Sequence, residues 1–254
     1  MATKKATPAK PTTAVAVKKA PAGGNIMNIT EALKAQVASM SGRIAPGGGN
    51  QIRLSKSGFE LPDGSKTPGP LELVIVDFTT SHRFYDTQYD PKNPTPPGCF
   101  AIGLNPKDMT PSSNSPNRQA DSCQDCPHNA FGPNGERKAC NNNRVLAVLP
   151  PDAKEDTPIW TLSVSPGALK GFDGYVAGVV RTFTLPPISV ITTVGLLPDV
   201  DYPSLTFSNP VQNPNLAAHF ARQAEARELL QVEPDVSGYV PPSGKRAPAG
   251  RGRR

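Results

Sequence analysis

Hydrophobic residues along this chain recur mainly at the spacing of β-strands. The strongest run, LELVIVDFTT at 71–80, is rich in β-branched residues and too short to prefer a buried helix, so we expect it at the centre of a sheet. The run IRLSKSGFEL at 52–61 predicts two strands bent around Ser57-Gly58. Further strands are predicted at 144–150, 159–164, 188–196 and 204–208.

Apolar residues recur at helical spacing in three other segments. A capping-box pattern at Asn28 and Glu31 predicts a helix over 28–41. Ser165-Pro166 predicts the start of a second helix, and a third is expected from 213 to 232. The expected packing positions are Leu169, Phe172, Tyr175, Val176 and Val179 in the second helix, and Leu216, Phe220, Ala224 and Leu229 in the third.

These elements predict a β-rich α+β domain. The second helix falls between two groups of predicted strands, and one further helix is expected near each end of the chain. This order fits an OB-like five-stranded barrel, which carries a helix between its third and fourth strands and often binds oligonucleotides. A general α+β sheet domain is the alternative, because periodicity does not reveal strand order.

Charge separates the chain into a body and two tails. Residues 1–24 contain five lysines and no acidic residue, and residues 243–254 contain five basic residues and no acidic one. Because the net charge is +6, residues 25–242 carry −4. The tail composition predicts disordered basic arms at 1–24 and 233–254 around a single domain at 25–232. Such arms either attract nucleic acid non-specifically or act only as solubilising tails.

Several classes of protein are disfavoured by what the sequence lacks. No stretch approaches the ~20 apolar residues that span a bilayer, and the N-terminal MATKKATPAK has no apolar signal core, so we expect a soluble intracellular protein without a membrane partner. Neither a phosphate-binding glycine motif nor a G-x-S-x-G elbow is present. Asp77 with Asp86 or Asp90 could form a nuclease metal pair, but isolated acidic residues are usually solvated or capping. We therefore do not expect an enzyme.

Four cysteines share one Gly/Pro-rich segment, 81–143, in the spacing C-x23-C-x2-C-x13-C. Two cysteines separated by two residues can reach one tetrahedral ion from a tight turn, and the remaining two can complete the coordination. We expect structural Zn²⁺ that staples the loop insertion, with an iron–sulfur cluster as the alternative metal centre. Disulfides or free thiols would leave the cysteines without a metal, and His128 is a further possible ligand. The predicted ligands are Cys99, Cys123, Cys126 and Cys140.

Basic and aromatic residues alternate in SHRFYDTQYD at 81–90, a pattern that suits single-stranded nucleic acid. Aromatic faces stack on unpaired bases while basic groups follow the phosphates. The alternative is that the aromatic residues cover the core of the cysteine loop. Lys138 and Arg144 could either offset the charge of bound thiolates or face phosphate. The candidate contacts are Arg83, Phe84, Tyr85 and Tyr89, a weaker group of Arg53, Lys56 and Phe59, and the two residues Lys138 and Arg144.

Three runs, YDPKNPTPPGCFAIG, SCQDCPHNAFGPNGERKACNNNRVLAVLP and PPISVITTVG, resemble a group of four-cysteine proteins from tailed bacteriophages. The resemblance covers residues 70–208 and implies a single-stranded-DNA-binding protein of phage replication or recombination, in the cytoplasm of an infected bacterium. The chain also resembles, more loosely, the zinc-containing OB-fold proteins that coat single-stranded DNA in T-even phages.

The resemblance has one departure and leaves further functions open. Such coat proteins usually end in an acidic tail that recruits partners, whereas this chain ends in GKRAPAGRGRR. Phage replication proteins or virion proteins are the protein partners that the resemblance implies. The alternative functions are a virion-associated interaction protein whose arms contact DNA and, with less support, a metal-dependent DNA-processing enzyme.

Overall fold

The computed structural model describes residues 49–242, except 89, 91–92, 199 and 201. The chain divides into two compact units, Met1–Ala45 and Pro46–Arg254, and every described residue belongs to the second. The helix predicted at 28–41 and the arm at 1–24 therefore lie outside the described residues.

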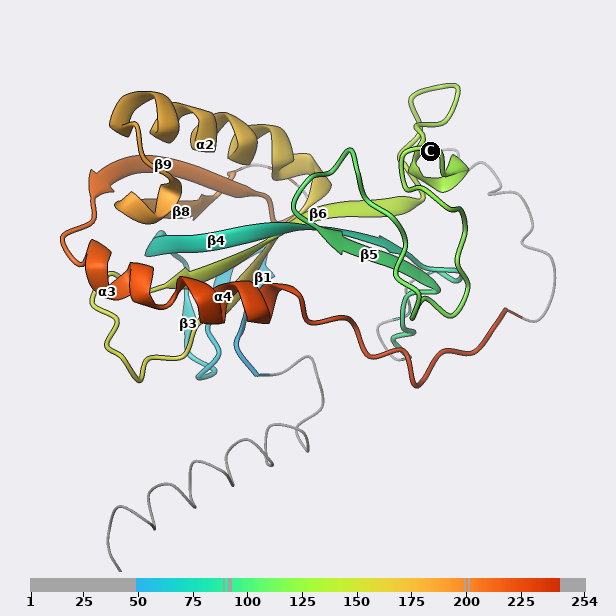
Figure 1. Ribbon diagram of the computed structural model, residues 1–254, viewed down its shortest axis with the longest axis horizontal. Helices are drawn as coiled ribbons and strands as arrows, with labels where there is room; N and C mark the ends of the chain where they lie inside the picture. The colour runs from blue at the N-terminus through green and yellow to red at the C-terminus, as the bar shows by residue number, and fades with distance from the viewer. Residues whose placement is uncertain (1–48, 89, 91–92, 199, 201, 243–254) are drawn as a thin grey trace, which may run out of the picture. The chain divides into compact units, whose positions relative to one another are not determined.

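The described residues form one curled, mixed sheet (Figure 1). Its strands are β1 (Gln51–Ser55), β2 (Gly58–Glu60), β3 (Lys66–Thr67), β4 (Leu71–Phe84), β5 (Cys99–Gly103), β6 (Cys140–Leu149), β7 (Trp160–Val164), β8 (Val190–Leu196) and β9 (Leu205–Gln212). Their order is β3-β2-β1-β7-β6-β4-β8-β9, and β5 also pairs with β4. Only the β1–β7 pair is parallel among the described strands. The predicted β-rich α+β class is confirmed.

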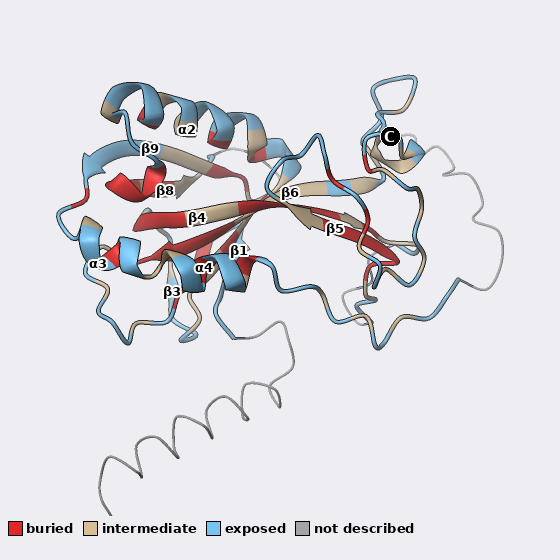
Figure 2. Ribbon diagram, in the orientation of Figure 1, coloured by how far each residue is buried: buried red, intermediate tan, exposed pale blue. Residues whose placement is uncertain are grey.

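Strand β4 is the centre of the sheet, as its sequence predicts. It pairs with β8 over its first residues, with β6 along most of its length, and with β5 over its last residues. Most of β4 is buried on both faces (Figure 2). It extends four residues beyond the predicted end at Thr80, because β5 and β6 supply hydrogen-bond partners on both of its edges as far as Phe84.

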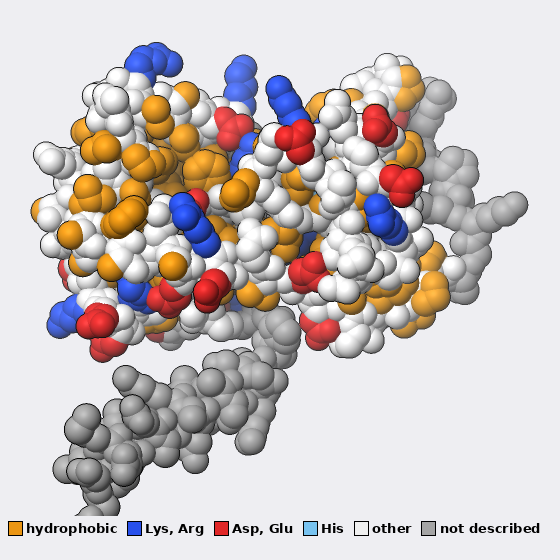
Figure 3. Space-filling view, viewed as in Figure 1, with side chains coloured by type: hydrophobic (Ala, Val, Ile, Leu, Met, Phe, Trp, Pro, Cys, Tyr) orange, Lys and Arg blue, Asp and Glu red, His pale blue; other side chains and the backbone are white. Residues whose placement is uncertain are grey.

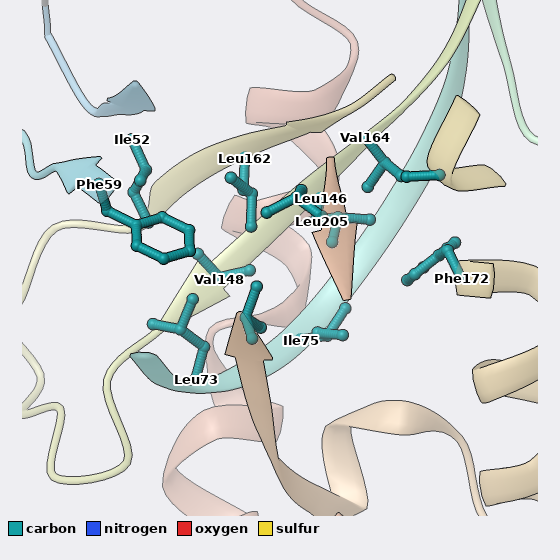
Figure 4. Close-up of a cluster of buried hydrophobic side chains, with 12 residues drawn as sticks. Ile52, Phe59, Leu73, Ile75, Leu146, Val148, Leu162, Val164, Phe172 and Leu205 are labelled. Carbon is teal, nitrogen blue, oxygen red and sulfur yellow. The ribbon is translucent and has the colours of Figure 1, made fainter. Parts of the chain in front are cut away.

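Two hydrophobic cores lie on opposite faces of the sheet. On one face, which we call the inner face, Leu146, Val148 and Leu162 pack with Phe172 of helix α2 (Leu169–Phe183) (Figure 4). On the other, the outer face, strand residues pack against helix α4 (Gln223–Leu230). The outer core comprises Val74, Val76, Ala147, Leu149 and Ile159 from strands and loops, with Ile188, Ala226 and Leu230.

The second predicted helix is confirmed and the third is corrected. Helix α2 follows a short 3-10 turn, η2 (Pro166–Ala168), and buries the predicted residues Phe172 and Val179. The third divides into α3 (Leu216–Ala221) and α4. In this pair Phe220 and Ala224 are not buried, whereas His219, Ala226 and Leu230 are buried. The other two predicted positions, Leu216 and Leu229, are partly buried against the outer core, so the predicted stripe is right in part. It misses His219, because a hydrophobic pattern does not count a polar residue at a buried position.

The C-terminal prediction also needs correction, because residues 233–242 are not part of a free arm. The Glu233 carboxylate accepts hydrogen bonds from Ser112 Oγ at 2.6 Å and from Asn114 Nδ2 at 2.7 Å. The Tyr239 hydroxyl donates to Asp86 Oδ2 at 2.9 Å. Short polar side chains of the cysteine loop therefore hold this segment in place. Among the described residues, no helix is both long and apolar enough to cross a membrane.

Candidate nucleic-acid interface and cysteine centre

A β-bulge in β4 determines which side chains of its second half lie on each face of the sheet. The pairing of β4 with β6 shifts between Ile75 and Asp77. One extra residue reverses which face each later side chain occupies. Beyond the bulge, Ser81 and Arg83 therefore line a groove on the outer face, whereas His82 lines a cavity on the inner face.

The four cysteines line that inner cavity, which has a volume of about 20 Å³. Strand register brings two of them together, because Phe84 of β4 pairs with Cys99 at the start of β5 and with Cys140 at the start of β6. The loop between β5 and β6 supplies Cys123 and Cys126. Cys123 is anchored by its backbone N–H, which donates to the Met109 carbonyl at 2.9 Å. Residues far apart in the sequence thus meet at one end of the sheet.

All four cysteines are free thiols. Burial and the neighbouring thiols raise the pKa of Cys123 to about 11 and that of Cys140 to about 12. These two thiols are therefore protonated at neutral pH unless a cation replaces the proton. Within the part of the chain that the structure describes, no three His, Cys, Asp or Glu side chains are arranged as a metal-holding group. A metal centre at these cysteines stays a prediction.

The donor set and the size of the cavity suit a single ion. Four sulfur donors match the preference of structural zinc, and a space near 20 Å³ accommodates about one water-sized particle. Binding an ion would require the four sulfurs to turn toward one point, an arrangement that the described residues do not show. His128 does not line the cavity, and its ring stacks on Phe84 with the centroids 4.2 Å apart.

A groove of about 460 Å³ lies on the outer face, beyond the part of the sheet that α4 covers. The strands contribute mainly neutral hydrogen-bonding side chains, and Arg83 and Tyr85 lie at the end of β4. The C-terminal residues Leu229–Asp235, including two acidic residues, line the other side except at 231. The polar lining from the strands consists of Gln51, Thr79, Ser81, Asn143, Thr161 and Ser163.

Several predicted nucleic-acid contacts are not accessible to a base. Phe59 is 1% exposed and belongs to the inner core, and Phe84 is 3% exposed beneath the His128 ring. Neither ring presents a face to solvent, so both are removed from the candidate interface. The alternative interpretation, that aromatic residues cover the core of the cysteine loop, describes Phe84. Tyr89 lies outside the described residues.

The predicted basic residues do not gather on one surface. Arg53 forms an ion pair with Glu60 at 3.9 Å, and Lys56 lies in the turn between β1 and β2. Arg144 faces α2, where its guanidinium lies 3.5 Å from the Asp173 carboxylate. Lys138 donates to Asn129 Oδ1 at 3.2 Å. Of the predicted contacts that the structure describes, only Arg83 and Tyr85 line the outer groove.

Two exposed aromatic residues near the cysteine loop were not predicted as contacts. Phe131 is 69% exposed, and the Lys138 ammonium lies 5.1 Å from its ring centroid. Tyr202 is 48% exposed, and Arg137 lies 5.9 Å from its ring centroid. An aromatic residue inside the polar turn NAFGPNG is the sequence signal that could have identified Phe131. Both rings offer cation–π pairs of the kind that accept a stacked base.

A separate apolar groove lies between α3, α4 and the turn η3 (Pro187–Ser189). Its volume is about 800 Å³, and Leu185, Leu216 and Phe220 contribute to its lining. In Figure 3 hydrophobic side chains gather on the half of the visible face that carries α2 and α3. Asp77 and Arg227 form an ion pair at 2.7 Å at this groove.

Comparison with protein-family models, curated protein sequences and solved structures finds no match to this chain. The comparisons therefore do not identify a phage protein group, and the resemblance to phage proteins stays a prediction.

Proposed function

We propose that this protein binds single-stranded nucleic acid on the outer face of an OB-like sheet. Strand order supports this proposal most directly. Strands β7, β6, β4, β8 and β9 are consecutive neighbours, and α2 connects β7 to β8. If β4, β6, β7, β8 and β9 are numbered one to five, this is the neighbour order of an OB barrel with its helix between strands three and four. The parallel neighbour of β7 in the described sheet is β1 rather than β9, so the barrel is open at that edge.

The position of the outer groove agrees with this assignment. OB domains bind oligonucleotides over their second and third strands, between the loop joining strands one and two and the loop joining strands four and five. In this chain those strands are β6 and β7, which contribute Asn143, Val145, Thr161 and Ser163 to the groove. The cysteine loop and the loop that carries Tyr202 occupy the two flanking positions in the sequence.

The chemistry of the groove favours bases over a long run of phosphates. Gln51, Asn143, Thr161 and Ser163 are exposed or half-buried and can hydrogen-bond to base edges and sugars. Thr79 and Ser81 also line the groove, but they are buried and already bonded to the Gly103 carbonyl and to Arg83. Tyr85 can stack on an unpaired base, and Arg83 can contact one phosphate. With so few cations in the groove, most of the electrostatic attraction would come from the ten positive charges of the two tails. The body would thus contribute specificity for single strands, and the tails would contribute affinity for nucleic acid in general.

The cysteine centre has a structural role in this proposal. Zn²⁺ bound by Cys99, Cys123, Cys126 and Cys140 would hold the loop that flanks the groove, and bound thiolates would leave no position for a catalytic water. An iron–sulfur cluster is disfavoured by the small cavity volume of about 20 Å³. The resemblance to phage proteins would place this activity in DNA replication or recombination, with phage replication proteins as partners.

Substitutions in the groove test its role directly. Tyr85→Leu is expected to weaken binding of a labelled single-stranded oligonucleotide about 5- to 150-fold, because a lost stack costs ~1–3 kcal/mol. Arg83→Gln is expected to weaken binding and to reduce the salt dependence by about 0.7 in log–log slope, the value for one phosphate contact. Fluorescence anisotropy at several salt concentrations measures both quantities.

Arg181→Gln provides the matched control, since it removes one exposed charge from the last turn of α2, outside the groove. It should change affinity and slope far less than Arg83→Gln. If Tyr85→Leu and Arg83→Gln bind as tightly as this control, the nucleic acid does not occupy the outer groove.

A further inference from the structure

We propose that His82 is a positioning residue of the cysteine centre, donating a hydrogen bond from Nδ1 to one of the metal-bound thiolates. This inference rests on the proposed metal centre and adds a fifth residue to it. Sequence spacing did not associate His82 with the cysteines, because it lies 17 residues before Cys99 in a segment with an aromatic–basic pattern.

Strand register places His82 directly behind two of the cysteines. It pairs with Ala101 of β5 and with Asn142 of β6. Each of these partners lies two residues after a cysteine, and two residues is the repeat of side chains on one face of a strand. His82 therefore occupies the same inner face as Phe84, one step deeper in the sheet, and its side chain lines the cysteine cavity.

The imidazole is buried with one nitrogen unsatisfied. His82 is 3% exposed, and its Nδ1 atom has no hydrogen-bond partner. Two nearby atoms on the same two strands, Thr80 Oγ1 and Asn142 Oδ1, are also buried without partners. Buried polar atoms are nearly always paired in folded proteins, so an unpaired nitrogen on a residue that lines the cysteine cavity indicates a missing partner at this position.

The protonation state of the cysteines indicates that the missing partner of His82 Nδ1 is a thiolate. A cysteine thiol carries only a weak donor, whereas a divalent cation displaces its proton to solvent and leaves an anionic sulfur that accepts hydrogen bonds. His82 is buried, and burial disfavours the charged imidazolium, so the ring suits the role of a neutral donor. A neutral ring protonated at Nδ1 can then donate to the thiolate. Such a bond orients the ligand and reduces the charge that the buried centre must carry.

The test compares three full-length variants with the wild-type protein by zinc competition against a chromophoric chelator. His82→Leu removes the donor and is expected to weaken zinc binding about 10- to 100-fold, as losses of such outer partners do. His82→Asn keeps an N–H near the position of Nδ1 and should restore most of that loss. His219→Leu is the matched control, because His219 is also a buried histidine but lies in α3, outside the cavity lining.

A second measurement uses the wild-type protein and does not depend on the variants folding. In ¹⁵N spectra, His82 should be a neutral ring protonated at Nδ1 when zinc is bound. A ring protonated at Nε2, or one whose nitrogen is itself coordinated to the metal, would overturn the donor role. Equal zinc affinity in His82→Leu and wild type would overturn it as well, while leaving the metal centre intact. Absence of stoichiometric zinc binding by the wild-type protein would overturn the metal centre and the role of His82 together.

Discussion

Replacing Phe172 by alanine is expected to lower the free energy of unfolding by about 3–5 kcal/mol, the usual cost of removing a fully buried phenylalanine. Phe172 is 0% exposed and anchors α2 to the inner face of the sheet. Its ring makes edge contacts with Phe78, at a centroid distance of 5.2 Å, and with Phe207, at 5.0 Å. These rings come from β4 and β9, so one cavity would weaken contacts among three elements.

Urea unfolding followed by circular dichroism measures this effect, and Phe220→Ala is the matched control. Phe220 is 61% exposed on α3, so its removal should cost far less than that of Phe172. Equal losses for the two variants would mean that α2 does not pack on the sheet through Phe172.

The second large effect is expected when the metal is removed from the zinc-loaded protein, or when Cys126 is replaced by serine. The segment from 85 to 139 should then become sensitive to proteases while the rest of the sheet remains folded. Within it the structure describes one strand, β5, one 3-10 turn, η1 (Pro127–Asn129), and a small buried cluster of Ala101, Met109 and Cys123. So little apolar burial cannot offset the conformational entropy of a long loop. Structural zinc contributes about 10–16 kcal/mol of apparent binding free energy in small zinc domains. Binding free energy of this size would offset the conformational entropy that apolar burial leaves uncompensated.

Hydrogen exchange with peptide-level resolution measures this effect segment by segment. Peptides from 85 to 139 should lose protection in the metal-free protein, while peptides from β6 and β7 keep theirs. Ser113→Ala, an exposed change in the same loop, is the control and should leave the pattern unchanged. Identical protection with and without metal would show that the loop folds on its own contacts.

Sequence patterns predicted most of the strands, because these are short hydrophobic runs, but they missed β3 and β5, which lie in turn-rich segments. Residues 71–80 form the central part of β4, and the prediction at 159–164 matches β7 to within one residue. The four cysteines that were predicted as metal ligands line one cavity, and metal binding by them stays a prediction. In each case a local signal was sufficient, either hydrophobic run length or the close spacing of Cys123 and Cys126.

The faces of β4 could not be predicted for a specific physical reason. Residues 73–76 are all buried, so the alternation that reveals the faces of a strand is missing where the bulge occurs. The pattern therefore could not show that His82 faces the cysteines while Arg83 faces the groove. For the same reason Phe84 was predicted as an accessible ring, although it lies between Cys99 and Cys140.

The sequence did not reveal that residues 233–242 are held in place, because the contacts of this segment are polar and distant in sequence. Glu233 reaches Ser112 and Asn114 across more than a hundred residues, and Tyr239 reaches Asp86. A composition rich in Pro and Gly suggests disorder when no such partners are visible. Here those hydrogen bonds connect the end of the described chain to the cysteine loop beside the groove.

Competition between single-stranded and duplex DNA of the same length tests the central proposal most directly. Full-length protein is titrated against a labelled single strand at increasing salt, with unlabelled single strand or duplex as competitor. Since the tails bind either form through charge while the groove accepts only unpaired bases, the preference for single strands should reach at least about tenfold at high salt. Equal competition by the two forms, with binding that disappears as salt rises, would contradict a single-strand site on the sheet and leave only the charge of the tails.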